Sequence, residues 1–584
     1  MRRSRKPRGH SRWNTWPPPK AEVLGVARTL TSATRVLDVM DLLRVEDGIA
    51  KYYTVNPGSA FADGLHEYLA SVVGQNVLTW EEATRRSFHL AVACAVHPSM
   101  RRLDAPLMVM PHGAGYNRLV SESTGDATSP AGLSRRELVH RGKVVPAAIG
   151  LSHHDQLARL FRTCPEAVPR AEVIGDWCFQ RIKDSEGQRD WYRARLGVAD
   201  GRRLVVIHST WSEHSLLGRH PRLPLDLVTA LPADEFAVAA VFHPNVWARH
   251  SWSSVLERLR GPMEAGLMVI PPQEGWRAAV VASDWVIGDH GSTTFYSAAA
   301  ERVTLLAADG LEELDPASPA AAFGRTAPRL DPEGDLHAQL LKAEREHDPD
   351  VLRPVIDSQL ADIDKSGELT QRRMYEFLAH RGVRLPRQPP EPRPVPDPEP
   401  ERHRPPTAYE ATGAVGSDGS VEVRRWPMVA GGQGQERGFY AVAAESPHPL
   451  WSQSADVVAR TVAVAEPAPA EWCLREAPRR PGAAVLVARI DETSAVVWLR
   501  DILFEARTVR SWGAPRPELD PLLLGAAVNL WLTQGRSGAE LVNGLVVRTG
   551  RRSIRVAFTK PVAEESGISP KGGSSLDLEG GPGQ

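Results

Sequence analysis

The sequence predicts an α/β protein with two parallel-sheet halves in tandem, followed by a proline-rich linker and a smaller α+β domain. Short apolar runs alternate with amphipathic stretches over residues 20–384, and this alternation is typical of a parallel sheet wrapped by helices. The 584 residues exceed what one hydrophobic core can organise, so several domains are expected. Residues 385–407 carry repeated prolines, which remove amide donors and hold the backbone extended.

The composition narrows the class of protein. Hydrophobic residues make up 42% of the chain and charged residues 24%, as in soluble globular proteins. The 70 basic and 71 acidic residues nearly cancel, so the overall charge favours no specific nucleic-acid partner. Four scattered cysteines without a CxxC pair or a secretion signal predict reduced thiols and no structural zinc. We therefore predict a cytoplasmic protein, and leave peripheral contact with a membrane open.

Three segments are predicted to lie outside any core. Residues 1–19 contain basic residues and no acidic one, which predicts a disordered arm with weak attraction to an anionic membrane. Residues 385–407 are predicted to be an unstructured spacer. Residues 563–584 are rich in Gly, Ser and charge, and predict a disordered tail. The remainder divides into 20–172, 173–384 and 408–562.

The first half of the body shows strand and helix patterns in alternation. Strands are predicted at 23–27, 52–55, 76–79, 90–93 and 107–110, and helices at 33–43 and 61–73. Ligands of such sheets bind beyond the carboxyl ends of the strands. The strand 107–110 runs into Pro111-His112-Gly113-Ala114-Gly115-Tyr116-Asn117. His112 in this loop is either simply solvated or functional, and the pattern leaves both interpretations open.

In the second half, several strands end in polar or histidine-bearing loops. Strands are predicted at 147–151, 171–174, 204–208, 236–242, 267–270 and 285–288, and helices at 276–282, 335–346 and 349–381. The strand 204–208 leads to Thr210 and Trp211, the strand 236–242 to His243, and the strand 285–288 to Asp289. Convergence at one sheet edge is more specific than any single motif. These patterns predict two Rossmann-like halves with a cleft between them.

The stretch 285–296 predicts a strand, a turn at Gly291 and a helix that begins with Ser292, Thr293 and Thr294. The first turn of a helix offers free backbone N–H groups and the positive end of the helix dipole, which suit a phosphate. Small hydroxyl residues let an anion approach closely. The simpler interpretation is an ordinary turn between strand and helix with a capping residue.

These motifs, in this order along residues 20–380, resemble GT-B fold transferases. They are His112-Gly113, Gly175-Asp176, Ser209-Thr210-Trp211, His243-Pro244 and Asp289-His290-Gly291-Ser292-Thr293-Thr294. The pattern is most similar to the CDP-glycerol glycerophosphotransferase family of teichoic acid polymerases, and more distantly to UDP-N-acetylglucosamine 2-epimerases. The resemblance implies that the His-Gly and the His-Pro face each other across the cleft. It also implies that the hydroxyl-rich helix start holds the donor's pyrophosphate.

The resemblance implies a transferase that moves a sugar or a polyol-phosphate group from a nucleotide-diphosphate donor to an acceptor hydroxyl. The expected catalytic residues are His112 as base, His243 as a group that stabilises the leaving diphosphate, and Asp289 as an orienting residue. The expected nucleotide-binding residues are Thr210, Trp211, Gly291, Ser292, Thr293 and Thr294. Residues 20–172 would be the acceptor side and 173–384 the donor side. No metal and no other cofactor is expected.

Two other functions stay open. The chain could be a nucleotide-binding or interaction module whose catalytic residues have drifted. It could also be a UDP-sugar 2-epimerase, an activity that would require carboxylates in the cleft. Residues 408–562 predict a small α+β domain of antiparallel strands with one main helix at 519–532. No catalytic motif occurs there, so its expected role is to bind a protein partner or to support an oligomer.

Overall fold

The computed structural model describes residues 16–120, 125–198, 201–401, 404–429, 438–500, 502–510 and 516–560. Most of the predicted basic arm and the whole predicted tail therefore lie outside the described residues. The chain forms two compact units. The first contains residues up to 409 together with 424–436 and 550–552, and the second contains most of the remainder. Each unit is described by itself.

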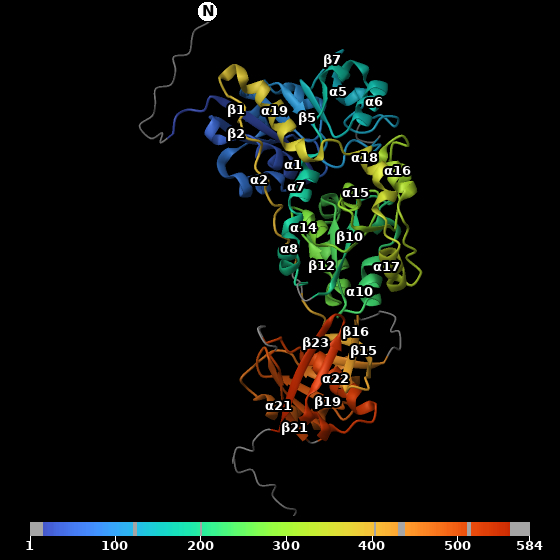
Figure 1. Ribbon diagram of the computed structural model, residues 1–584. Coiled ribbons are helices and arrows are strands. Elements are labelled where there is room, and N and C mark those ends of the chain that lie inside the picture. Colours follow the sequence, from blue (N-terminus) through green and yellow to red (C-terminus); the bar gives the residue numbers. More distant parts are fainter. Residues whose placement is uncertain are drawn as a thin grey trace, which may run out of the picture. The chain divides into compact units, whose positions relative to one another are not determined.

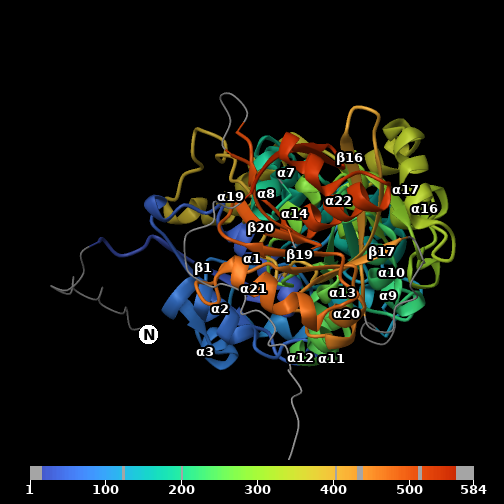
Figure 2. The same cartoon turned by 90° about the horizontal axis from the view of Figure 1, so that it is seen from below.

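The first unit begins with a seven-stranded parallel sheet in the order β3-β2-β1-β4-β5-β8-β9. Its strands are β1 (Ala21–Ala27), β2 (Ile49–Val55), β3 (Val77–Leu78), β4 (Leu90–Ala93), β5 (Leu107–Val109), β8 (Ala148–Leu151) and β9 (Ala171–Val173). The central strand β4 is buried throughout because helices cover both faces of the sheet. Figures 1 and 2 show α1 (Leu30–Met40) beside β1, and α2 (Leu65–Val73) packs against β2 and β3.

A second, five-stranded parallel sheet follows in the order β12-β11-β10-β13-β14. Its strands are β10 (Arg203–Ser209), β11 (Phe236–Phe242), β12 (Met268–Ile270), β13 (Trp285–Gly288) and β14 (Val303–Leu306). Every residue of β11 is buried, which explains its uninterrupted apolar sequence. Two apolar clusters lie on opposite faces of this sheet. The predicted α/β class with two parallel-sheet halves is confirmed.

The remaining helices of the first unit complete these layers, with a small hairpin of β6 (Val139–His140) and β7 (Lys143–Val144). They are α3 (Trp80–Arg85), α5 (Arg135–Leu138), α6 (His154–Thr163), α7 (Trp177–Asp184), α8 (Arg189–Arg195), α9 (Leu216–Arg219), α10 (Leu223–Ala230), α11 (Pro244–His250), α12 (Trp252–Arg258), α13 (Arg260–Glu264), α14 (Trp276–Ala282), α15 (Ser292–Ala299), α16 (Pro319–Thr326), α17 (Leu336–Arg345), α18 (Arg353–Asp357) and α19 (Ser366–Leu378).

Two helices connect the halves. Helix α7 lies between the two sheets in Figure 1, with Trp177 in the core of the first half and Phe179 in the core of the second. Helix α19 returns to the first half, where Met374 and Leu378 join the first core. The closing helices were all expected to lie with the second half. One helical segment was predicted over 349–381, but the helix is interrupted near Asp362, whose φ is +49°.

The proline-rich segment is extended, as predicted, but it is packed against the first unit rather than unstructured. Val395 is only 2% exposed and belongs to the core of the second half. Its amide donates to Ser185 Oγ (3.0 Å), and its carbonyl accepts from the Tyr192 hydroxyl (2.8 Å). The expectation of an unstructured spacer was wrong here, because Val395 among the prolines packs into the core of the second half.

The second unit contains most of a closed nine-stranded barrel, in the order β15-β16-β22-β23-β21-β20-β19-β18-β17. Its strands are β15 (Ala408–Val415), β16 (Ser420–Pro427), β17 (Phe439–Ala443), β18 (Val457–Arg460), β19 (Val485–Arg489), β20 (Ser494–Leu499), β21 (Ile502–Thr508), β22 (Leu545–Thr549) and β23 (Arg552–Thr559). Its helices are α20 (Pro449–Ser454), α21 (Pro469–Glu476) and α22 (Pro521–Thr533).

The barrel corrects the prediction of purely antiparallel strands. Strands β17, β18 and β19 pair in parallel, as do β16 and β22, whereas β19, β20, β21 and β23 pair antiparallel. The predicted main helix is present as α22, which packs against β17, β18 and β19 with 11 of its 13 residues buried. Closure pairs strands far apart in sequence, which local patterns cannot reveal.

All four cysteines are buried and free of disulfide bonds. Among the described residues, no helix combines the length and the apolar composition needed to cross a bilayer.

Candidate active site

The loops at the carboxyl ends of the two sheets meet within the first unit. The Ala114 amide, after β5, donates to Ser292 Oγ at the start of α15 (3.0 Å). The Tyr296 hydroxyl donates to Asp176 Oδ2, after β9 (2.6 Å). A β-carbon at Gly113 would collide with Ser292 Oγ, so a larger residue there would displace the Ser292 side chain. The predicted cleft is therefore closed tightly around this point.

His112 is held in one orientation by the neighbouring strand end. Its Nδ1 lies 3.0 Å from the Cys94 carbonyl oxygen. A carbonyl only accepts hydrogen bonds, so Nδ1 carries the proton and Nε2 of the neutral ring is left as an acceptor. His112 is exposed, yet the surrounding protein excludes part of the water that would stabilise a charged ring. This desolvation lowers the pKa of His112. A neutral imidazole with a free Nε2 lone pair results.

His243 has the opposite arrangement. It caps α11, and its Nδ1 accepts the Asn245 amide (3.1 Å), so Nε2 of the neutral ring carries the proton. Nε2 lies 3.4 Å from Thr31 Oγ1 of the first half. Burial, and after it the neighbouring His112, hold the pKa of His243 well below its usual value. The two histidines are therefore near each other, neutral, and present one acceptor and one donor.

Asp289 is enclosed by hydrogen bonds. Its Oδ2 accepts from the Thr210 amide (2.8 Å), the Thr210 hydroxyl (2.9 Å) and the Leu216 amide (2.9 Å). Its Oδ1 accepts from the Gly291 amide (3.0 Å), and the residue is 1% exposed. This geometry makes Asp289 an anchor that joins the loop after β10 to the turn before α15. His290 contacts Glu313 instead, with Nε2 and Oε2 3.0 Å apart.

The hydroxyl residues at the start of α15 differ in their access to the cleft. The N-cap is Gly291, so no side chain caps the first amides of the helix. Ser292 and Thr293 are half-buried, whereas Thr294 is 0% exposed with its side chain over Gly288. Thr294 therefore faces the sheet. Which of three consecutive helix residues faces the sheet depends on how the helix is rotated against it, and the run of hydroxyl residues does not reveal this.

Trp211 lies between groups from both halves. Its ring centroid is 4.2 Å from that of His243, and the Arg118 guanidinium carbon lies 3.8 Å from the indole centroid. Arg118 also pairs with Glu313 Oε2 (2.5 Å). Burial opposes ionisation of that carboxyl, but the hydrogen bond from His290 and the charge of Arg118 lower the pKa of Glu313 to about 2. Arg118 thus covers the ring that was expected to line the nucleotide pocket.

Sequence reasoning missed Arg118, Glu313 and Arg35 as members of this region. Arg118 directly follows the His112 loop, which was the available signal, whereas Glu313 lies in a turn without any motif. Arg35 Nε donates to the His112 carbonyl (3.0 Å) from helix α1. No spacing rule connects residues 77 positions apart.

A buried ionic cluster holds the two halves together behind the site. Asp38 of α1 accepts from Arg277 of α14 (2.5 Å) and from Arg181 of α7. Burial disfavours the charge, but Arg277 and Arg181 lower the pKa of Asp38. Burial likewise raises the pKa of Asp176 nearby. A cavity of about 30 Å³, lined by Arg35, Asp38 and Asp176 among others, is large enough for one water.

Within the described part of the chain, no group of three or more His, Cys, Asp or Glu residues could hold a metal ion. The two histidines can accept or donate a proton at this edge, and the first-turn amides of α15 and the Arg118 side chain can donate hydrogen bonds to an anion.

Comparison with known proteins finds similarity among solved structures. No protein-family model matches the chain, and no curated protein matches it. The wall teichoic acid polymerase TagF, in a variant soaked with CDPG, is 12% identical, covers 63% of this chain and 90% of its own, and has a TM-score of 0.46. MnaA of S. aureus with UDP is 9% identical, with coverages of 63% and 99% and a TM-score of 0.39.

A UDP-GlcNAc 2-epimerase from Neisseria meningitidis bound to UDP-GlcNAc is 12% identical, with coverages of 62% and 100% and a TM-score of 0.38. The solved structures that this chain is similar to thus include the two families that its motifs resemble. At such identities the similarity concerns the fold alone.

Proposed function

We propose that the chain is a GT-B-type transferase that moves a sugar or polyol-phosphate group from a nucleotide-diphosphate donor to an acceptor hydroxyl, without a metal ion. The observation that carries this proposal is the pair His112 and His243, because they come from different halves, influence each other electrostatically, and present one proton acceptor and one donor. Such a transfer needs one group to take a proton and another to stabilise the departing phosphate.

His112 is the proposed base. Its Nε2 lone pair removes the proton from the acceptor hydroxyl as the acceptor oxygen bonds to the transferred group. The lowered pKa keeps the ring neutral at neutral pH, so the lone pair is available. The Cys94 carbonyl holds the tautomer, and the Arg35 bond to the His112 carbonyl holds the loop.

His243 and the start of α15 are proposed to hold the donor phosphates. The bond between the transferred group and the nucleotide phosphate oxygen breaks, and charge grows on that oxygen. The Nε2–H of His243 and the first-turn amides of α15, near Ser292 and Thr293, can donate to it. The positive charge of Arg118 acts on both histidines, and it would add charge stabilisation if it moved from Trp211 toward the diphosphate.

Nucleotide binding is the first test. Thermal shift of the full chain with CDP, UDP and GDP should reveal stabilisation by at least one of them. Failure of all three would favour an interaction module whose catalytic site has drifted. Conversion of UDP-N-acetylglucosamine without an acceptor would favour an epimerase.

Activity of variants is the second test. Once a donor is identified, His243→Ala should lower transfer or donor hydrolysis by about 100-fold or more, while the melting temperature changes little. His112→Asn should lower transfer similarly. His250→Ala is the matched control, because this exposed histidine lies at the other end of α11. Equal activity of the His243 variant and the control would exclude His243 from the mechanism.

A further inference from the structure

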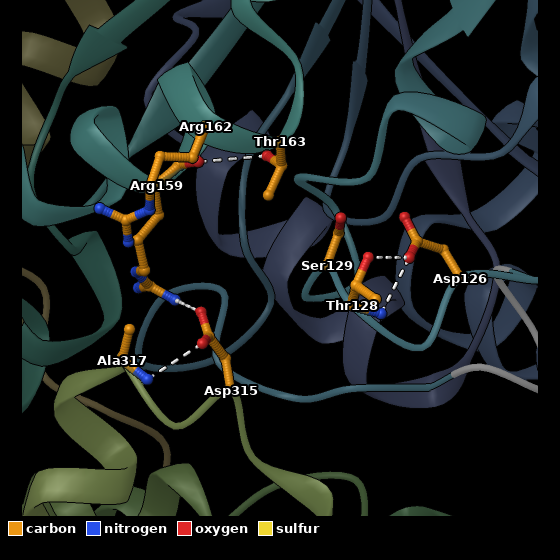
Figure 3. A pocket seen from close by; sticks show the side chains of 8 residues that line it. All are labelled: Asp126, Thr128, Ser129, Arg159, Arg162, Thr163, Asp315 and Ala317. Carbon is orange, nitrogen blue, oxygen red and sulfur yellow. Dashed lines mark hydrogen bonds and ion pairs between the residues drawn. The ribbon is translucent and has the colours of Figure 1, made fainter.

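Buried arginines in the described part of the chain are paired with a carboxylate, with one exception. Arg159 is a typical case, at the wall of a polar cavity of about 410 Å³ beside the His112 loop. It is 1% exposed, and Figure 3 shows it paired with Asp315 (3.3 Å). The five buried arginines with such an ion pair are Arg35, Arg159, Arg181, Arg277 and Arg425. The sixth buried arginine, Arg460, forms no ion pair with a described residue.

Arg460 is the last residue of β18 in the barrel, and one edge of its guanidinium has no partner. The residue is 5% exposed, and its Nη1 donates to the Pro467 carbonyl (2.8 Å). The guanidinium carbon lies 5.5 Å from the centroid of the Trp472 ring. Nε and Nη2 are buried, and neither has a hydrogen-bond partner among the described residues. These two N–H groups lie on the same edge of the guanidinium, so together they can bind two oxygen atoms of one anion.

Two groups near Arg460 could carry a negative charge, and neither neutralises it. Glu445 acts on Arg460 electrostatically, but this residue is exposed. Its carboxylate accepts instead from the amide (3.0 Å) and the hydroxyl (3.3 Å) of Thr461 and from the Val462 amide (3.2 Å). The Cys473 thiol is fully buried, and burial raises its pKa to about 12, so the thiol is neutral at neutral pH. A buried cation without a counter-charge is costly, and an anion bound from solution would remove that cost.

The helix that follows β18 supplies further donors at the same place. Helix α21 begins at Pro469, two residues after the carbonyl that Arg460 contacts, and no side chain caps it. The amides of Ala470 and Glu471 in its first turn therefore have neither an intrahelical partner nor a cap, and they carry the positive end of the helix dipole. The Glu471 carboxylate is exposed, so water screens its repulsion of an anion. The parallel strands β17, β18 and β19 end at this edge, where parallel sheets bind their ligands.

We propose that the unpartnered edge of Arg460 and the first turn of α21 bind a phosphate group. The guanidinium edge takes two oxygen atoms of the ligand, and a phosphate has further oxygen atoms for the first-turn amides, whereas a carboxylate has none left. Both nitrogen atoms are covered by protein, so binding requires a local movement, for which the exposed residues 462–466 between β18 and α21 are suited. This site gives the barrel a ligand of its own and does not rest on the proposed transferase function.

Calorimetric titration of the full chain tests the proposal first, with inorganic phosphate, O-phosphoserine and acetate as probes. We expect both phosphates to bind, and acetate to bind at least about tenfold more weakly, because it cannot reach the helix amides as well as Arg460. Tighter binding of O-phosphoserine than of inorganic phosphate would support the site with an organic phosphate as ligand, and equal binding would support it with free phosphate. Failure of both phosphates to bind, or equal binding of acetate, overturns the proposal.

A pair of matched variants assigns the binding to Arg460. Arg460→Met keeps an apolar side chain beside Trp472 and removes the guanidinium, so it should weaken phosphate binding about tenfold or more. Arg475→Met is the control, because Arg475 is exposed in the last turn of the same helix and should leave the affinity almost unchanged. Unchanged affinity in a folded Arg460→Met protein would show that phosphate binds elsewhere, and overturns the proposal.

Hydrogen exchange of the wild-type chain provides a test that needs no variant. Phosphate should slow the exchange of amides in peptides that cover residues 461–473 and leave peptides from α22 unchanged, because only the first group contains the proposed site. Slower exchange confined to the start of α15 would place the phosphate at the proposed donor site alone, and overturns the proposal. A chain that binds phosphate at residues 461–473 but binds no nucleotide would support this site and contradict only the transferase function.

Discussion

At the scale of single residues, His112 and His243 are distinguished by what their Nδ1 atoms contact. A carbonyl oxygen faces Nδ1 of His112, and an amide N–H faces Nδ1 of His243. The same residue type therefore presents a proton acceptor in one case and a donor in the other. The proposed proton transfer by this pair has a direct consequence for the dependence of activity on pH.

We expect the acid limb of kcat/KM to have its midpoint below pH 6.5. The surrounding protein excludes water from both rings and so lowers the pKa of His112 and of His243. The neutral forms therefore persist below the usual histidine range, and activity falls only when they protonate. Rates measured from pH 4.5 to 8.5 with an identified donor provide the test. A midpoint above pH 7 would contradict the neutral pair.

Glu137 of α5 leads to a second prediction, on how the stability of the fold depends on pH. Burial, and to a lesser extent the charge of Asp126, raises the pKa of Glu137 to about 7, against the Gly132 amide that donates to it. A raised folded-state pKa gives stability that is present below the unfolded pKa, about 4.3, and is lost as pH rises through 7.

Glu137→Gln should therefore stabilise the protein at pH 8 by about 1–3 kcal/mol and have almost no effect near pH 4. The neutral amide can still accept the Gly132 amide without the cost of a buried charge. Urea denaturation at both pH values measures the difference. Glu81→Gln, at an exposed position of α3, is the control. A gain that did not depend on pH would exclude ionisation of Glu137 as the cause.

At the scale of elements, the start of α15 combines residues with two different environments. Thr293 is half-buried at the cleft, whereas Thr294 is buried with no hydrogen-bond partner for its hydroxyl among the described residues. A phosphate would reach the first and not the second. The proposed phosphate site therefore includes fewer hydroxyl groups than the run of three hydroxyl residues in the sequence suggests.

Thr294→Val should leave nucleotide-induced stabilisation unchanged and should alter the free energy of unfolding by less than about 1 kcal/mol, because it removes an unsatisfied buried hydroxyl and keeps the shape. Thr293→Ala should reduce the nucleotide-induced shift in Tm. Thermal shift with the best nucleotide compares the two variants. A larger loss in Thr294→Val than in Thr293→Ala would place the phosphate deeper than proposed.

At the scale of the whole molecule, the proline-rich segment is part of the first unit. Arg181 of α7 donates to the Pro394 carbonyl (2.8 Å) and also pairs with Asp38 of the first half. Arg393 pairs with Asp41 of the first half (3.0 Å). The segment thus reinforces the connection between the halves that form the proposed cleft.

Val395→Asp should destabilise the first unit by about 2–5 kcal/mol, because it places a charge in the core of the second half. Urea denaturation monitored by tryptophan fluorescence measures the loss. Glu391→Ala, at an exposed position of the same segment, should have little effect. Equal stability of both variants would mean that the segment is not packed in solution.

The sequence predicted the strands of the two parallel sheets, because they are short apolar runs that periodicity detects directly. The strands at 147–151 and 171–174, expected with the second half, instead form β8 and β9 of the first sheet, since sheet membership depends on pairing and not on local pattern. It did not predict the closed barrel, because the strands of the barrel pair over long distances along the chain. In the candidate site it identified His112 and His243 from their positions after strands. It could not identify Arg118 and Glu313 as partners, because only contact between the halves brings them together.

The order of strands, helices and polar strand ends is determined by the sequence itself, because hydrophobic periodicity and turn residues act over a few neighbours. The tertiary structure alone decided which nitrogen of each histidine carries the proton, that Thr294 faces the sheet, that the proline-rich segment packs, and that a polar cavity lies beside the His112 loop. Each of these depends on burial and on partners far away in the chain. Such contacts exist only after folding, so no local pattern encodes them in readable form.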